Sequence, residues 1–327
     1  MRILTGIQPT NNLHIGNLFG ALIPMVRLQE KEELTMMIAD LHAITVKQNP
    51  EMLRENIKFA LATYLACGID PEKTIIFQQS TVPEHSELGW LMQTITKMGE
   101  AERMTQFKDK SGSGAERVSV GLFTYPSLMA ADILLHQAEV VPVGKDQKQH
   151  LELARTLAGR FNQQFGDTLT VPKPLISKTG SAKILSLSEP EKKMSKSAPS
   201  AKSYISVMDD SDAVHAKIRS AVTDSEREIT ADEGRLGLYN LLTIFSLVDG
   251  RSQQDIARSY SGKGMKDLKD DLAEALIAYL APIQLRIQDY MANEGKLQKI
   301  LKQGERQARA QAKPTIEAAK AAMGLTI

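Results

Sequence analysis

The chain has 327 residues, of which 42% are hydrophobic and 24% charged, and its formal net charge is +1. This composition is ordinary for a globular protein, excludes collagen-like, coiled-coil and largely disordered chains, and gives no sign of a nucleic-acid partner. The single cysteine, Cys67, excludes an internal disulfide and a cysteine-rich metal site, and its apolar helical surroundings predict a buried thiol. No apolar run reaches membrane-spanning length and no signal peptide is recognisable, so we expect a cytoplasmic protein with no membrane partner.

The first half of the chain alternates short apolar runs with segments of helical spacing. Strands are expected at 2–5, 34–39, 75–77 and 139–143, and helices at 15–30, 51–67, 84–98, 128–136 and 147–165. The run 34–39 is almost continuously apolar, as in a strand buried on both faces of a parallel sheet. Further on, 172–174 is expected to be a loop, 184–187 a short strand and 189–202 a polar surface loop. The alternation predicts an α/β fold, a Rossmann-like doubly wound parallel sheet.

After about residue 209 the strand signals stop. Helices are expected at 213–221, 236–247, 253–259 and 266–292. We therefore expect a second, all-helical domain at 209–292 after a catalytic domain at 1–208. The remaining residues, 293–327, form a C-terminal helical segment whose stretch 296–320 carries seven Lys and Arg against two Glu.

The turn from Gly6 to Asn17 is the first candidate site. It lies between the first strand and the first helix, where open α/β sheets bind ligands and where helix N–H groups favour phosphate. His14 and Asn17 can donate hydrogen bonds to phosphate, and Gly16 allows close backbone approach. The alternative, an ordinary strand–turn–helix with a surface histidine, is the better account of this segment taken alone. The dinucleotide fingerprint G-x-G-x-x-G is absent, which disfavours a dehydrogenase.

The string Lys193-Met194-Ser195-Lys196-Ser197 is the second candidate. Two lysines and two hydroxyls on a polar loop suit a polyphosphate whose charge grows during reaction. The alternative is a solvated basic loop, which is common.

Together the two segments resemble the class I aminoacyl-tRNA synthetases. More narrowly, the order of motifs is similar to that of the bacterial tryptophanyl-tRNA synthetases, in dense matches over 1–225 and weaker ones beyond. The matching segments are 6–9, 39–45, 102–108, 124–126, 128–134, 144–150 and 193–197. Asn17 stands where the class signature usually ends in histidine, a departure common in the tryptophan branch. Lys145 stands where the family usually has an acidic residue, which alters the charge expected near the ribose.

The resemblance implies an ATP site and the residues that hold it. The implied catalytic residues are Gln8, His14, Asn17, Lys193, Ser195 and Lys196. The implied ATP-binding residues are Gln8, Pro9, Thr10, Gly16, Asn17, Gly144, Lys145, Asp146, Ile184, Lys193, Met194, Ser195, Lys196 and Ser197. Mg²⁺ is expected with ATP, and no separate protein-held metal.

Asp132 matches the residue by which the family recognises tryptophan. A carboxylate accepts a hydrogen bond from the indole N–H, and a ring without that donor leaves the buried carboxylate unpaired. The alternative for Asp132 from the sequence alone is a surface helix residue, which its apolar neighbours disfavour. The same pocket is expected to include Leu4, His42, Tyr125, Met129, Val141, Val143 and Gln147, for most of which core packing is an equally good account.

The implied reaction is activation of L-tryptophan by ATP, followed by transfer to the 3′ end of tRNA(Trp). The helical domain is expected to bind the anticodon, the C-terminal segment to pack back on the catalytic domain, and the chain to form a homodimer. The nearest alternative is a tyrosyl-tRNA synthetase, against which the intact lysine string, the segment 129–132 and the short N-terminus speak. A non-catalytic RNA-binding paralogue and a small-metabolite nucleotidyltransferase are the alternatives from other classes.

Overall fold

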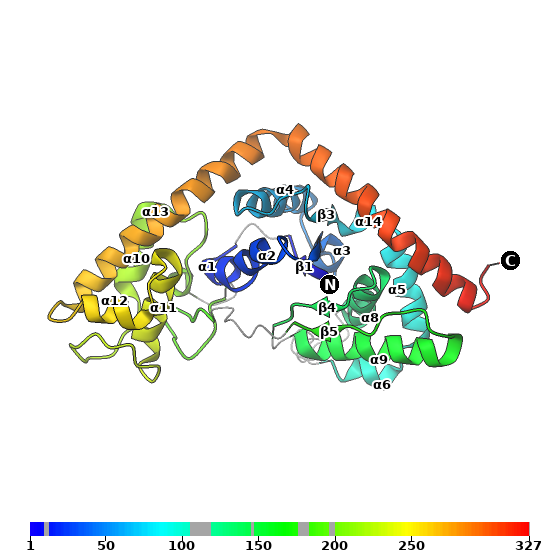
Figure 1. Cartoon of the computed structure of the whole chain (residues 1–327), viewed down its shortest axis with the longest axis horizontal. Coiled ribbons are helices and arrows are strands. Elements are labelled where there is room, and N and C mark those ends of the chain that lie inside the picture. The colour runs from blue at the N-terminus through cyan, green and yellow to red at the C-terminus, as the bar shows by residue number, and fades with distance from the viewer. Residues whose placement is uncertain (10–12, 105–118, 145–146, 176–182, 196–199, 327) are drawn as a thin grey trace.

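The computed structural model describes residues 1–9, 13–104, 119–144, 147–175, 183–195 and 200–326. Within these ranges the strands form one parallel five-stranded sheet in the order β3-β2-β1-β4-β5 (Figure 1). Its strands are β1 (Arg2–Ile7), β2 (Glu33–Ile38), β3 (Ile75–Gln78), β4 (Val140–Val141) and β5 (Lys173–Pro174). The chain runs outward from β1 to β3 and then returns to the other side of β1, so the strand order reverses between β1 and β4. The predicted Rossmann-like parallel sheet is confirmed.

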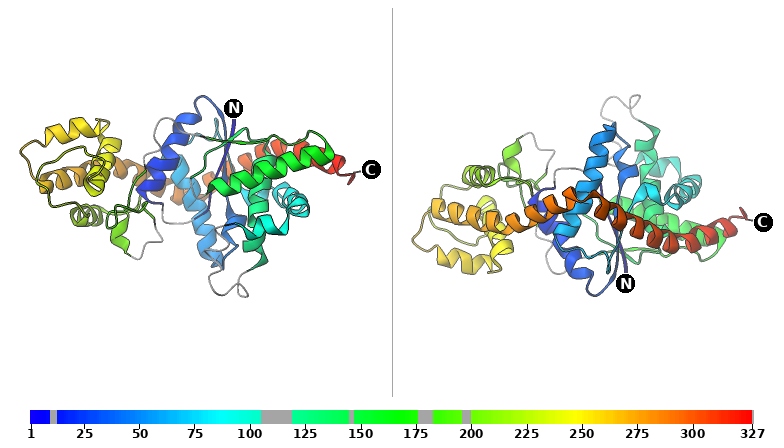
Figure 2. Two further views of the ribbon diagram at one scale, coloured as in Figure 1. Left: turned by 90° about the horizontal axis from the view of Figure 1, so that it is seen from below. Right: turned by 90° about the horizontal axis from the view of Figure 1, so that it is seen from above.

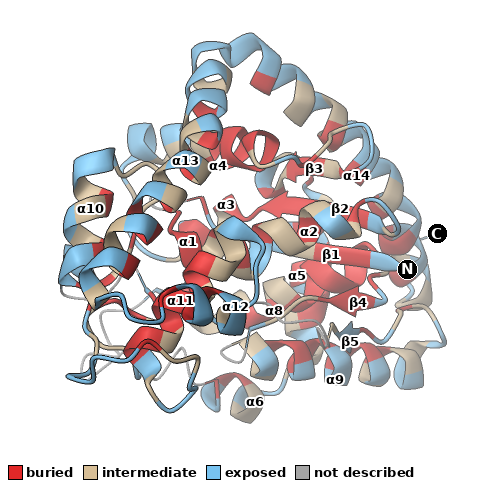
Figure 3. Cartoon of the chain, turned by 60° about the vertical axis from the view of Figure 1, so that its left-hand side comes forward, coloured by how far each residue is buried: buried red, intermediate tan, exposed pale blue. Residues whose placement is uncertain are grey.

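Alternate residues of β1 to β4 enter two separate cores. Ile3, Met36 and Ile76 belong to one cluster of buried residues, and their neighbours Leu4, Met37 and Phe77 belong to the other. Because successive side chains of a strand point to opposite faces, both faces of the sheet are covered. Figure 3 shows this buried layer with exposed residues on the outer helices.

The helices between strands supply those covers. Their bounds are α1 (Ile15–Asn17), a π-helical turn (Leu18–Leu22), α2 (Ile23–Leu28), α3 (Asp40–Ala43), α4 (Pro50–Ala66), η2 (Gln79–Thr81), α5 (Glu84–Ile95), α6 (Met98–Glu102), α8 (Val120–Leu135) and α9 (Lys148–Phe165). The segments α1, α2 and α4 pack on one face, while α5, α8 and α9 pack on the other. Cys67 follows α4 and is half-buried rather than fully buried, and burial raises the pKa of its thiol to about 12.

The second half is helical after a short 3₁₀ turn, η5 (Ala201–Ser203). Its helices are α10 (Ser211–Ser220), α11 (Leu236–Asp249), α12 (Gln253–Ser259), α13 (Met265–Ala292) and α14 (Glu294–Ala322). Figures 1 and 2 show α13 running from the α10–α12 group past α4, and α14 continuing after a bend past β3 toward the opposite end of the molecule. At Gly304 the backbone of α14 meets the edge strand β3 so closely that an added Cβ would lie 1.7 Å from the Ile76 carbonyl oxygen. Helix α14 therefore covers an edge that would otherwise expose unpaired backbone groups.

Four local predictions differ from the structure. The helix expected from residue 128 begins at Val120, where the Ser119 hydroxyl caps it by accepting from Leu122 N. The helix expected to reach residue 98 stops at Ile95, because Thr96 is extended (ψ 129°) before α6.

The other two differences concern strands. Residues 173–174, expected to be a loop, form the strand β5. Lys173 N donates to the carbonyl of Glu139, just before β4, and Leu175 N donates to that of Val141 in β4. Pro174 lies between these two donors, at a position where the strand pairing needs no N–H. Residues 184–187, expected to be a strand, make only an isolated bridge from Leu185 to Lys193. Both the N–H and the carbonyl of Leu185 bond to the side chain of Asn240 on α11 rather than to a neighbouring strand.

Candidate active site at the carboxyl edge of the sheet

The reversal of strand order places the ends of β1 and β4 side by side. Gln8 follows β1 and is exposed, and Pro9 is buried. Gly144 follows β4, is exposed, and its carbonyl accepts from Gln147 N at 3.0 Å. This is the position at which open α/β sheets bind ligands. Thr10, Lys145 and Asp146 lie outside the described residues.

The His14–Asn17 turn is anchored on both sides. Residues 13–15 pair with 205–207 through Ile15 N to Ile205 O (3.0 Å) and Val207 N to Leu13 O (2.8 Å). His14 is only 5% exposed, so the alternative of a surface histidine is wrong. A Cβ on Gly16 would lie 2.8 Å from His14 Nδ1, so only glycine leaves room for that ring. Asn17 is half-buried, and its Oδ1 accepts from His14 N at 3.3 Å.

The lysine string reaches the same turn. Met194 is buried, and its N–H donates to the carbonyl of buried Ile184 at 3.0 Å. Met194 Cβ would be 3.5 Å from a Cβ on Gly16, so the two motifs, far apart in the sequence, are in contact. Lys193 and Ser195 flank Met194 and are exposed. Lys196 and Ser197 lie outside the described residues.

Asp132 on α8 is the centre of a buried polar cluster and is 1% exposed, so the surface-helix alternative is wrong. Its Oδ2 lies 2.6 Å from His42 Nε2, and its Oδ1 lies 2.7 Å from His85 Nδ1 and 2.8 Å from Gln79 Nε2. Burial disfavours the charged carboxylate, but the charges and hydrogen bonds of His42 and His85 outweigh it and hold the pKa of Asp132 well below its usual range. Asp132 is therefore a buried carboxylate that remains ionised.

Apolar side chains expected in the pocket share the core cluster that surrounds Asp132. Leu4 and Val141 are buried in it, and Met129 and Val143 pack against it half-buried. Tyr125 meets the His42 ring edge-on at 6.0 Å, and its hydroxyl lies 2.7 Å from His150 Nε2. Burial raises the pKa of Tyr125 to about 12, so its hydroxyl stays protonated. Gln147 is the N-cap residue of α9, directly before the turn that carries His150.

Three members of the Asp132 cluster were not among the predicted site residues: Gln79, His85 and His136. Gln79 directly follows β3, so its place at the carboxyl edge of the sheet was a usable signal. His85 lies in the first turn of α5 and His136 directly follows α8, and their spacing in sequence gives no sign that the rings meet at 3.2 Å. Asp40, which belongs to a matching motif, also lies at this edge and accepts from Gln78 Nε2 and Ser80 N.

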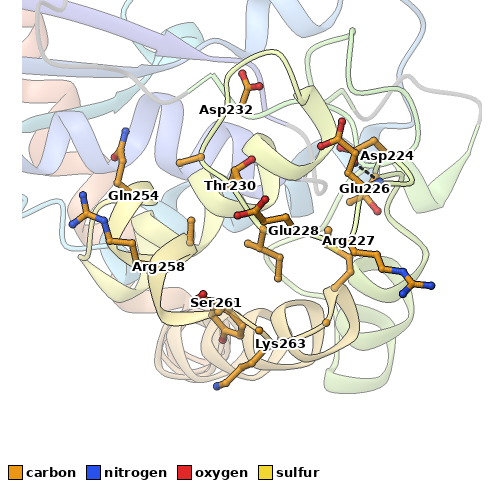
Figure 4. Close-up of a pocket in the computed structure, with 18 of the residues that line it drawn as sticks. Asp224, Glu226, Arg227, Glu228, Thr230, Asp232, Gln254, Arg258, Ser261 and Lys263 are labelled. Carbon is orange, nitrogen blue, oxygen red and sulfur yellow. Dashed lines mark hydrogen bonds between the residues drawn. The ribbon is translucent and has the colours of Figure 1, made fainter.

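A separate cavity of about 1220 Å³ lies in the helical region and contains none of the predicted site residues. Its lining comes from the loop between α10 and α11, from α12, and from the turn between α12 and α13 (Figure 4). Charged side chains of both signs line it, among them Asp224, whose carboxylate pairs with Arg235 at 2.5 Å. The cavity is therefore wide and its charged side chains are exposed, unlike the buried Asp132 cluster.

Within the described ranges no helix is both long and apolar enough to cross a membrane. The same part of the chain has no group of three or more His, Cys, Asp or Glu side chains placed to hold a metal ion.

Comparison with known proteins gives one consistent result. The family model for class I tRNA synthetases (W and Y) matches residues 1–281. The tryptophan--tRNA ligase of Oceanobacillus iheyensis is 51% identical over 324 residues, covering 99% of this chain and 98% of the relative. The crystal structure of the tryptophanyl-tRNA synthetase of Mycoplasma pneumoniae superimposes with a TM-score of 0.90 at 38% identity (99% and 98% covered). The crystal structure of the Campylobacter jejuni tryptophanyl-tRNA synthetase complexed with ADP and tryptophan superimposes with a TM-score of 0.85 at 37% identity, covering 99% of this chain and 100% of the relative. The chain therefore belongs to the class I tRNA synthetases for tryptophan and tyrosine, and within them to the bacterial tryptophanyl-tRNA synthetases.

Proposed function

We propose that this chain activates L-tryptophan with ATP to tryptophanyl-adenylate and transfers the amino acid to the 3′ end of tRNA(Trp). The observation that carries the proposal is the contact of Gly16 with Met194, which brings the glycine turn and the lysine string to one site beside β1 and β4. Neither segment alone is specific, but their meeting at the strand-order reversal is the arrangement a nucleotide site requires.

ATP enters this site as its Mg²⁺ complex. We assign phosphate binding to Gln8, Pro9, Thr10, Gly16 and Asn17, ribose binding to Gly144, Lys145 and Asp146, and adenine binding to Ile184. The tryptophan carboxylate attacks the α-phosphate in line and pyrophosphate leaves. Since the carboxylate is already a nucleophile, the step needs no protein base, only alignment and charge stabilisation. Lys193, Lys196 and the hydroxyls of Ser195 and Ser197 supply positive charge and hydrogen bonds as the charge on the leaving pyrophosphate grows.

Tryptophan binds against Asp132 and the apolar residues Leu4, Met129, Val141 and Val143, with His42, Tyr125 and Gln147 beside it. The Asp132 carboxylate accepts the indole N–H. The Campylobacter jejuni relative, crystallised with ADP and tryptophan, supports both substrates.

Transfer requires a tRNA and, in our proposal, a second copy of the chain. We assign 1–208 to catalysis, 209–292 to the anticodon and 293–327 to a strap on the catalytic part, in a cytoplasmic homodimer. The exposed Ile44, Val46 and Val120 support a dimer face, because the Ser119 hydroxyl donates to Thr45 O and so joins the two segments that carry them.

The test is exchange of pyrophosphate into ATP, with tryptophan and tyrosine assayed in parallel. Exchange with tryptophan alone is the expected result. Exchange with tyrosine alone would overturn the assignment of Asp132. Absence of exchange with both, in a folded sample with Mg²⁺, would favour the non-catalytic RNA-binding paralogue.

A further inference from the structure

The carboxylate of Asp132 is held by donors from three separate elements. Gln79 of η2 and His85 of α5 both contact Oδ1, at 2.8 and 2.7 Å, whereas His42 of α3 contacts Oδ2 at 2.6 Å. A carboxylate oxygen has two lone pairs. Oδ1 is therefore fully used by the protein, and Oδ2 retains one acceptor position.

The far side of His85 is also held. Its Nε2 lies 3.2 Å from Nε2 of His136, whose Nδ1 lies 3.3 Å from Gln311 Oε1 on α14. Burial is the main cause that lowers the pKa of His136, to about 3, so this ring is neutral and carries one N–H. His136 therefore has a single N–H to share between His85 and Gln311.

The plane of the His85 ring is fixed by packing. Phe77 of β3 stacks on it with centroids 5.5 Å apart and an interplanar angle of 23°, and Phe77 also contacts the His136 ring at 5.4 Å. Both His85 and Phe77 are fully buried. The imidazole therefore has no freedom to turn away from Asp132, and a side chain without its Nδ1–H would leave Oδ1 short of a donor.

We propose that His85, with Gln79, is a positioning residue for substrate specificity: it saturates Oδ1 and turns Asp132 so that the free position of Oδ2 receives the indole N–H. The inference rests on the proposed function. His85 itself does not touch the substrate. It acts by fixing where the single remaining acceptor points, and so decides how strongly the site distinguishes a ring with an N–H from one without it.

The experiment compares His85→Leu with the unmodified chain in pyrophosphate exchange, using tryptophan and its analogue with sulfur in place of the indole nitrogen. We expect KM for tryptophan to rise by about 10- to 100-fold, the loss expected for one charge-assisted hydrogen bond. KM for the sulfur analogue, which has no N–H to place, should change less than about two-fold. His85→Asn, whose amide can donate from near the Nδ1 position, should recover most of the preference for tryptophan.

Two further variants keep the test decisive. Gln79→Met removes the other donor to Oδ1 from a different element and should show the same selective loss, even if His85→Leu fails to fold. Tyr64→Phe, a change in a fully buried side chain of the opposite core, should leave the ratio of the two KM values unchanged.

Equal rises in KM for both amino acids, or no rise for either, would overturn the positioning role while leaving the proposed function intact. Absence of tryptophan-dependent exchange in the unmodified chain would overturn the proposed function itself.

Discussion

Two regions of the molecule differ in how they hold their charged groups: the polar cluster around Asp132, between η2, α5 and α8, and the cavity of the helical region. In the first, a carboxylate that is 1% exposed has its donors fixed by the core. In the second, Glu226, Arg227 and Glu228 are exposed on a loop around a space of about 1220 Å³. Buried charges are strongly coupled to their partners, whereas exposed ones are screened by water. The first region suits recognition of one small group, and the second suits a large, hydrated ligand.

Removing the Asp132 carboxylate is the strongest test of the difference between the two regions. Asp132→Leu leaves the donors of His42, His85 and Gln79 buried without their acceptor, so we expect the free energy of unfolding to fall by about 3–5 kcal/mol. Glu228→Leu, the matched loss of an exposed carboxylate at the cavity, should change it by less than about 0.5 kcal/mol. Urea denaturation at neutral pH measures both. Similar losses in the two variants would contradict the distinction between the regions.

The second change tests whether the buried region depends on α14. Gly304→Ala places a methyl group where the Ile76 carbonyl lies 1.7 Å away, and since that atom is backbone, helix and strand must move apart. We expect a loss of about 1–3 kcal/mol in the free energy of unfolding. Gly159→Ala is the control, because its Cβ meets nothing within 4 Å on the exposed side of α9, and it should stabilise by about 0.5–1 kcal/mol. A stable Gly304→Ala chain would mean that α14 does not pack closely on β3 in solution.

The third prediction concerns how the stability of the fold depends on acidic pH. The pKa of His136 falls from 6.5 in the unfolded chain to about 3 in the fold, mainly through burial. Between these values the unfolded state binds a proton that the folded state does not, so stability falls as pH decreases below 6.5. His136→Leu should remove this contribution, which amounts to roughly 1.4 kcal/mol per pH unit below 6.5.

Thermal or urea unfolding of both proteins between pH 7 and 5 measures the effect, which we expect to reach roughly 2 kcal/mol at pH 5. The depressed pKa of Asp132 acts at lower pH, because its stabilisation is complete above about 3.8 and is lost only as pH falls below that value. Parallel stability curves for wild type and His136→Leu would show that His136 is not neutral in the fold.

The same contrast explains what the sequence could reveal. Strands β1 to β3 and most helices were predictable, because continuous apolar runs and helical spacing are local properties of the chain. The absence of a strand at 184–187 and the presence of β5 were not predictable. The first depends on hydrogen bonds to the Asn240 side chain, and the second on how the residues beside Pro174 pair with β4. Both are contacts between segments that are distant in sequence or invisible to periodicity.

The candidate site was likewise predictable only in part. Asp132, His14 and the lysine string were found from their motifs, and the structure places the described ones at or near the carboxyl edge of the sheet. Of the partners of Asp132, His42 was predicted, whereas His85 was missed, because it and His136 come together only through the packing of α5 against α8. The roles of the motif residues in binding stay predictions until the variants are measured.

The smallest expected effect concerns the exposed side chains at the cavity of the helical region. Arg227 and Lys263 are exposed at the cavity, and Lys263 lies over the Tyr260 ring at 5.0 Å. If this surface contacts tRNA phosphates, Arg227→Ala and Lys263→Ala should each lower kcat/KM for tRNA about five-fold, corresponding to roughly 1 kcal/mol, and flatten its salt dependence. Pyrophosphate exchange needs no tRNA and should be unchanged in both. Loss of exchange would connect the helical region to the activation site, whereas unchanged aminoacylation would place the tRNA on another surface.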